Sequence, residues 1–88
     1  MLPEGNTVEV NSMPDCIHCT EAKVWLSLHG IPFKEIVHPD PAERQAFYDA
    51  NGLVGGKRTM PQVFLVDEIS GDRSLLGGAS DLKASGLA

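Results

Sequence analysis

The sequence predicts an α/β fold in which four short strands form a mixed sheet flanked by three helices, in the order βαβαββα. Two observations support this prediction. Short stretches of strand-like residues recur between stretches of helical periodicity, and Gly, Pro, Asp and Asn fall at the junctions. With 88 residues, the chain can bury one modest core, so residues 1–88 are expected to form a single domain.

The first strand is expected at residues 7–12, where Val8 and Val10 alternate with polar neighbours. A helix follows from about residue 17 to residue 29, with Asp15 as the expected N-cap. Apolar side chains occupy more than a third of its circumference: Ile17, Ala22, Val24, Trp25, Leu26 and Leu28. We therefore expect the sheet and a neighbouring element to cover this helix, with Trp25 in the core.

The remaining elements follow from similar patterns. They are expected, in chain order, as a strand at 33–38 parallel to the first, a helix at 41–51, an antiparallel pair of strands at 62–66 and 74–76, and a short helix at 80–87. Asp40, Pro41 and Glu43 form a typical helix start, with a capping side chain, a proline and a carboxylate in the first turn.

Both cysteines, Cys16 and Cys19, lie at the start of the first predicted helix. Residues three apart on a helix have side chains about 5–6 Å apart, a gap that a disulfide can span. The free N–H groups and the positive end of the helix dipole stabilise a thiolate at Cys16, which predicts Cys16 as the nucleophile. Cys19 then suits the role of the resolving thiol. His18 is either a neutral surface residue or, in the sharper interpretation, a modulator of this pair, because an imidazole beside the thiolate stabilises the reduced form.

A metal half-site is the alternative interpretation of the two cysteines, since the same spacing supplies two ligands in many zinc sites. The sequence has no second cysteine pair, and His18, His29 and His38 show no ligand-like spacing. A redox pair is therefore preferred, and no metal is expected.

Charge and hydropathy restrict the possible partners. Seven Lys and Arg against twelve Asp and Glu give a net charge of −5, which disfavours nucleic acid. No apolar stretch approaches the roughly 20 residues needed to cross a bilayer, and the start shows no secretory signal, so a cytoplasmic protein is expected. Lys57 and Arg58 form a local basic spot that suits either a small anionic ligand or a solvated loop.

Taken together, the motifs resemble the glutaredoxin family, in its short bacterial and phage form. Four signatures occur in the family's order: Cys16-x-x-Cys19, Thr59-Met60-Pro61, Gly77-Gly78 and Asp81. The resemblance implies a thioredoxin-like fold, with Pro61 in the cis form facing the cysteines. It also implies glutathione as reductant and co-substrate, and a role in electron transport and cell redox homeostasis.

The resemblance further implies a glutathione-binding surface. Its residues would be Lys57, Thr59, Met60, Pro61, Gly78, Ser80 and Asp81. The backbone of Met60 would pair with the cysteinyl part of glutathione, the N–H groups of Ser80 and Asp81 would hold its γ-glutamyl carboxylate, and Lys57 would lie near its glycyl carboxylate. The implied partners are disulfide-containing or glutathionylated proteins, with the protein itself a monomer.

Two other functions fit the same fold. The first is a redoxin that depends on thioredoxin reductase and donates electrons to ribonucleotide reductase, but such proteins usually end in an aromatic, glycine-containing motif that residues 83–88 lack. The second is a carrier of an iron–sulfur cluster with glutathione as co-ligand. Those carriers typically have Gly or Ser beside the nucleophile, where this chain has Ile17. A glutathione-dependent dithiol–disulfide oxidoreductase is therefore the leading prediction.

Overall fold

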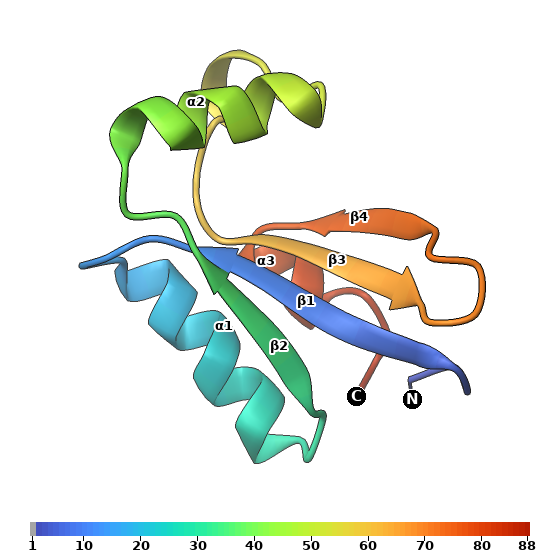
Figure 1. Cartoon of the computed structure of the whole chain (residues 1–88). Helices are drawn as coiled ribbons and strands as arrows, with labels where there is room; N and C mark the ends of the chain where they lie inside the picture. The colour runs from blue at the N-terminus through green and yellow to red at the C-terminus, as the bar shows by residue number, and fades with distance from the viewer. Residues whose placement is uncertain (1) are drawn as a thin grey trace.

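The computed structural model describes residues 2–88 and confirms the predicted order of strands and helices. The sheet consists of β1 (Asn6–Ser12), β2 (Phe33–Val37), β3 (Gln62–Asp67) and β4 (Arg73–Gly77), in the order β2-β1-β3-β4. β2 runs parallel to β1, and β3 runs antiparallel to both of its neighbours, β1 and β4. The predicted four-stranded mixed sheet is thus confirmed (Figure 1).

The helices are α1 (Ile17–Leu28), α2 (Pro41–Ala50) and α3 (Ala79–Lys83). Asp40 caps α2 as predicted, with its carboxylate accepting a hydrogen bond from Ala42 N–H at 3.0 Å. α3 ends at Lys83, earlier than the predicted residue 87, and the 3-10 turn η1 (Gly55–Lys57) was not predicted. α1 and α3 lie against each other on one face of the sheet, and α2 lies apart from them (Figure 1).

The main core lies between the sheet and the pair α1 and α3. Its fully buried side chains are Val8, Val10, Ala22, Leu26, Val63 and Leu82. The alternation in β1 that predicted a strand therefore also places Val8 and Val10 against the helices. A second cluster, made by Cys19, Tyr48, Leu53 and Met60, lies beneath the cysteine pair and joins α1 to α2 and the loop after it.

The expectation that α1 is covered around its whole apolar surface is wrong at three positions. Ile17, Val24 and Leu28 are 78%, 50% and 79% exposed. The sheet covers one side of α1, and α3, with only five residues, is too short to cover the rest. Trp25 is half-buried and packs against the edge of the main core. An apolar stripe on α1 consequently faces outwards.

Candidate active site

The loop after β1 places Cys16 directly at the start of α1. The Cys16 backbone is extended, and its Sγ accepts a hydrogen bond from the N–H of Cys19 at 3.2 Å. Cys16 therefore caps the helix itself. The prediction that Asp15 is the cap is wrong, because Asp15 adopts a left-handed conformation with φ of 55° and turns the chain before the helix. An N–H group aimed at Sγ favours a thiolate at this position when the pair is reduced.

Cys16 and Cys19 form a disulfide, with their Cα atoms 5.2 Å apart. Their exposures differ. Cys19 is 2% exposed and packs in the cluster with Tyr48 and Leu53, whereas Cys16 is only partly buried at the surface. An approaching disulfide can therefore reach Cys16 but not Cys19. The geometry supports a dithiol redox pair in which the two sulfurs have different access to substrate.

The Thr59-Met60-Pro61 segment faces this pair. The Met60-Pro61 peptide bond is cis, as the family resemblance implied, and the carbonyl oxygen of Met60 lies 3.6 Å from Cys16 Sγ. Met60 itself is 5% exposed and packs in the cluster around Cys19. The segment therefore forms one wall of the site, next to the reactive sulfur.

Two adjoining cavities lie on this side of the disulfide. The larger, of about 440 Å³, is lined by Lys57, Thr59, Gly78 and Asp81, among other residues. The smaller, of about 270 Å³, is lined by His18, Met60, Pro61 and Ser80 and shares Thr59, Gly78 and Asp81 with the first. All seven residues implied as glutathione-binding thus border one continuous surface, although they come from two segments about twenty residues apart.

Asp81 organises the C-terminal part of that surface. Its Oδ2 accepts a hydrogen bond from Gly78 N–H at 3.0 Å, which holds the start of α3. Gly77 has φ of 118°, and a Cβ there would lie 2.9 Å from the Cβ of Asp81. The absence of a side chain at Gly77 therefore leaves room for the Asp81 side chain.

The two basic residues in front of Thr59 have different surroundings. Arg58 donates to Gln45 Oε1 at 2.9 Å, forms an ion pair with Asp49 and lies over the Tyr48 ring. Lys57 is exposed at the edge of the larger cavity, and within residues 2–88 its ammonium has no ion-pair partner. Of the two cations, Lys57 is therefore the one free to meet an anion.

His18 lies at the surface, and its Nδ1 is 3.2 Å from a carboxylate oxygen of Glu21. Lys83 of α3 forms an ion pair with the same carboxylate. The hydrogen bond from Lys83, and then that from His18, lowers the pKa of Glu21. His18 thus borders the smaller cavity while bonded to Glu21, and its predicted influence on Cys16 stays a prediction.

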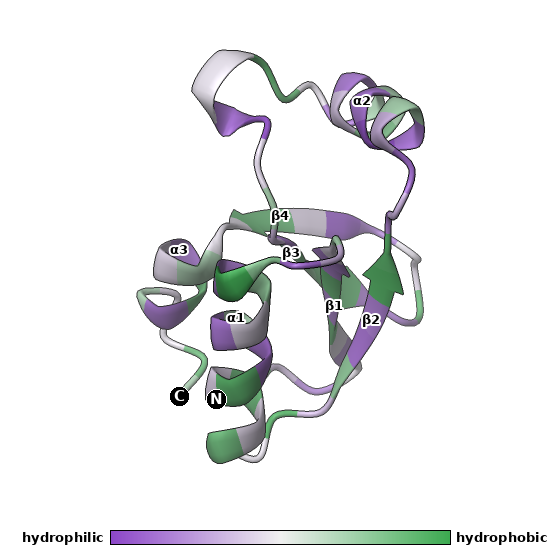
Figure 2. Cartoon of the chain, turned by 90° about the vertical axis from the view of Figure 1, so that its left-hand side faces the viewer, coloured by the Kyte–Doolittle hydropathy of each residue, from purple (hydrophilic) through white to green (hydrophobic). Residues whose placement is uncertain are grey.

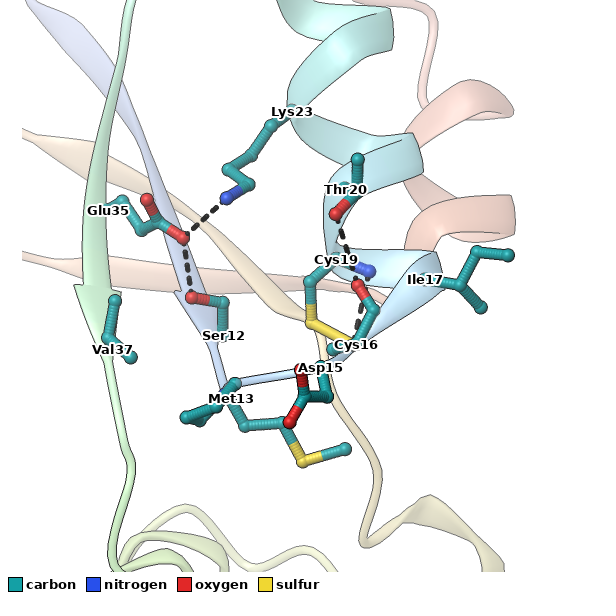
Figure 3. Close-up of a pocket in the computed structure, with 11 residues that line it drawn as sticks. Ser12, Met13, Asp15, Cys16, Ile17, Cys19, Thr20, Lys23, Glu35 and Val37 are labelled. Atoms are coloured by element: carbon teal, nitrogen blue, oxygen red, sulfur yellow. Dashed lines mark hydrogen bonds and ion pairs between the residues drawn. A yellow bond between two sulfur atoms is a disulfide. The ribbon is translucent and has the colours of Figure 1, made fainter.

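A further cavity, of about 750 Å³, opens on the other side of the disulfide, between α1 and β2 (Figure 3). Lys23 Nζ lies 2.9 Å from Glu35 Oε2, and the same oxygen accepts a hydrogen bond from Ser12 Oγ at 2.6 Å. The Ser12 bond, followed by the Lys23 bond, lowers the pKa of Glu35. The sequence did not reveal this cavity, because its residues come from three elements whose register was unknown.

The histidines of the alternative zinc site are dispersed. His29 Nδ1 lies 2.8 Å from the Trp25 carbonyl oxygen, and His38 lies between Asn11 and Glu43. Within residues 2–88, no group of three or more His, Cys, Asp or Glu side chains is arranged to hold a metal ion. Of the helices in that range, none is long and apolar enough to cross a membrane.

Two comparisons with known proteins point to the same family. A model of the glutaredoxin family matches residues 8–69. The structure is similar to that of glutaredoxin 1 from Francisella tularensis complexed with cacodylate, with 30% identity, a TM-score of 0.73 and 91% of each chain covered. It is also similar to glutaredoxin from Brucella melitensis, with 28% identity, a TM-score of 0.65 and coverage of 93% of this chain and 80% of that one. A search of curated protein sequences finds no match.

Proposed function

The chain belongs to the glutaredoxin family, and from this membership we propose that it is a glutathione-dependent oxidoreductase that reduces protein disulfides and mixed disulfides of proteins with glutathione. The family and the Cys16–Cys19 disulfide give the coarser conclusion, a dithiol oxidoreductase. Glutathione as the reductant, and the cytoplasm as the compartment that supplies it in reduced form, belong to the proposal.

In the proposed reaction, the Cys16 thiolate attacks a substrate disulfide, forms a mixed disulfide with one half and releases the other half as a thiolate. Cys19, as a thiolate, then attacks Cys16 Sγ and releases the second half, so that two electrons leave the protein and the Cys16–Cys19 disulfide forms. Two glutathione molecules return the electrons. The first attacks Cys16, forms a mixed disulfide with it and frees the Cys19 thiolate. The second attacks the bound glutathione, leaves as glutathione disulfide and frees the Cys16 thiolate. The observation that supports these roles is the access of the two sulfurs, since Cys19 is 2% exposed and Cys16 lies at the surface.

The surface on the Met60 side of the disulfide supports glutathione as the reductant. Its residues suit a small anionic peptide: a backbone segment beside Cys16 for strand-like pairing, a free Lys57, and the turn at Gly78. In this proposal Lys57 meets the glycyl carboxylate, and Ser80 and Asp81 meet the γ-glutamyl end. The imidazole of His18, which borders the same surface, modulates the thiolate. The reduction potential of a His18→Tyr variant tests that last role.

The deciding experiment compares two electron sources for the purified protein. With a glutathionylated substrate, we expect turnover with glutathione and glutathione reductase and little turnover with thioredoxin reductase. The reverse result would identify the protein as a redoxin that depends on thioredoxin reductase.

The cysteine roles predict different losses for two variants. Cys16→Ser should abolish activity with every substrate, because Cys16 alone meets the substrate. Cys19→Ser should keep reduction of glutathione mixed disulfides, which needs one thiol, and should lose reduction of protein disulfides. Both activities are measured by the oxidation of glutathione. Equal losses in the two variants would contradict the assignment.

Lys57 and Arg58 form a matched pair for the anion site. Lys57→Ala should raise the KM for a glutathionylated substrate about two- to fivefold at low salt, since an exposed charge contact contributes about 0.3–1 kcal/mol. Arg58→Ala should have a smaller effect on KM, because its guanidinium is bound to Asp49 and Gln45. The Lys57 effect should decrease as salt rises. A larger change of KM in Arg58→Ala than in Lys57→Ala would show that Arg58, and not Lys57, contacts the anionic ligand.

A further inference from the structure

The cavity between α1 and β2 borders the redox pair but is separate from the surface on the Met60 side that is proposed to bind glutathione. Cys16 and Cys19 both line it, together with residues of the β1–α1 loop and of β2. None of its lining residues lines the cavities on the Met60 side. The disulfide is thus flanked by two different surfaces, and a volume of about 750 Å³ is within the range of ligand clefts.

Exposed apolar side chains lie around this cavity. Val37, at the end of β2, is 50% exposed. Ile17 also lines the cavity, but its side chain points away from Val37 and Glu35 (Figure 3). Met13 and Pro14 add apolar surface from the loop before the cysteines. Figure 2 shows the apolar colour at the end of β2 and on turns of α1, the two elements that border the cavity. A partner seated here would remove apolar surface from water next to the reactive sulfur.

The charges in the cavity do not suit glutathione. The one cation, Lys23, is paired with Glu35 at 2.9 Å, and Ser12 binds the same carboxylate. Asp15, at the rim beside Cys16, has no ion-pair or hydrogen-bond partner within residues 2–88. The unpaired charge is therefore negative, and it favours a cationic partner over a tripeptide that carries two carboxylates.

We propose that this cavity is the docking groove for the polypeptide of a protein substrate, and that it selects substrates with an apolar side chain and a Lys or Arg close to the reacting cysteine. The proposal rests on the proposed redox function and adds to it the substrate class. Glutathione uses the Met60 side of the disulfide, and the polypeptide uses the side of Val37 and Asp15. Because Cys16 lines the cavity, a substrate cysteine docked there lies next to the nucleophile.

The test uses the full chain with Cys19→Ser, so that Cys16 reacts once. Heptapeptides carry one cysteine as a mixed disulfide with thionitrobenzoate, with Lys or Glu on one side of the cysteine and Leu or Ser on the other. The Cys16 thiolate forms a disulfide with the peptide and releases coloured thionitrobenzoate. Each rate is divided by that of the thionitrobenzoate disulfide of 2-mercaptoethanol, which has no polypeptide. Because no glutathione takes part, the outcome is independent of the proposed reductant.

We expect rates about threefold higher for Lys over Glu peptides and about threefold higher for Leu over Ser peptides, consistent with one surface charge contact and one partly buried side chain. Asp15→Asn, which still suits a left-handed backbone, should abolish the Lys preference and keep the Leu preference. Val37→Thr should reduce the Leu preference alone. Ile69→Thr, at a distant site that is 92% exposed, is the matched control and should change neither preference.

The proposed docking groove is rejected if the Cys19→Ser protein without surface substitutions reacts equally fast with all peptides. It is also rejected if Asp15→Asn and Val37→Thr change the preferences no more than Ile69→Thr does. A second copy of the chain could instead cover the apolar walls. In that case the mass in solution would rise to that of a dimer and the peptide preferences would be absent, which also overturns the proposal. Normal peptide preferences without glutathione-linked turnover would contradict the proposed reductant and leave the groove supported.

Discussion

Val8 and Val10, on one face of β1, are completely buried beneath α1 and α3, whereas Glu9 and Asn11, on the other face, are buried among polar partners. The first face is stabilised by apolar packing against the helices, including the fully buried Leu26 of α1. The second depends on specific contacts. The comparison shows that a strand with alternating apolar and polar residues can be buried on both faces.

Two groups of contacts stabilise the polar face. Glu9 receives two hydrogen bonds from Arg73 of β4, each at 3.0 Å, and the Arg73 guanidinium lies over the Phe64 ring. Asn11 Oδ1 lies 2.8 Å from His38 Nε2, and Glu43 of α2 lies 2.6 Å from His38 Nδ1. His38 is 7% exposed and packs on Phe47 of α2. This face therefore connects α2 to the sheet, and α2 leads into the segment that carries Lys57 and Met60.

The largest effect is expected on the apolar face. Leu26→Ala should lower the free energy of unfolding by about 2–5 kcal/mol, because it leaves a cavity at a fully buried position. Leu28→Ala is the matched control on the same helix: Leu28 is 79% exposed, so its loss should change that free energy by less than about 0.5 kcal/mol. Urea unfolding of the oxidised protein measures both. Similar losses in the two variants would show that Leu28 is covered in solution.

A smaller effect is expected on the polar face. His38→Leu keeps an apolar contact with Phe47 but leaves the buried Asn11 oxygen without its partner, which should cost about 1–3 kcal/mol. Glu43→Gln should cost less, because the Glu43 side chain is 48% exposed and water can replace the contact. The same urea experiment measures both variants. A neutral or stabilising His38→Leu would mean that packing alone also suffices on this face.

This difference between the faces explains what the sequence could predict. The strand that carries Val8 and Val10 was recognisable from local alternation, and helix geometry alone was enough to propose different roles for Cys16 and Cys19. Burial of Asn11 depends on His38, 27 residues away, and on the carbonyl oxygen of Gln62, 51 residues away. The exposure of Ile17 and Val24 depends on the length of α3. Local patterns carry no information on either long-range relation.

Glu35 gives the smallest expected effect and the sharpest test of the comparison, because it is an ionised side chain at the border of the apolar face. It pairs with Val10 in the sheet register and is bound by Ser12 and Lys23. The Ser12 hydrogen bond and then Lys23 lower its pKa in the folded protein, so the carboxylate contributes stability above its ordinary pKa of 4.5 and loses that contribution as the pH falls through the folded value. The stability difference between the native protein and Glu35→Gln should therefore be constant near neutral pH and shrink below about pH 4.5. Urea unfolding across that range measures it, with the exposed Glu4→Gln as control. A difference that does not depend on pH would show that Glu35 contributes by packing, as Val10 does, and that the whole face is stabilised in one way.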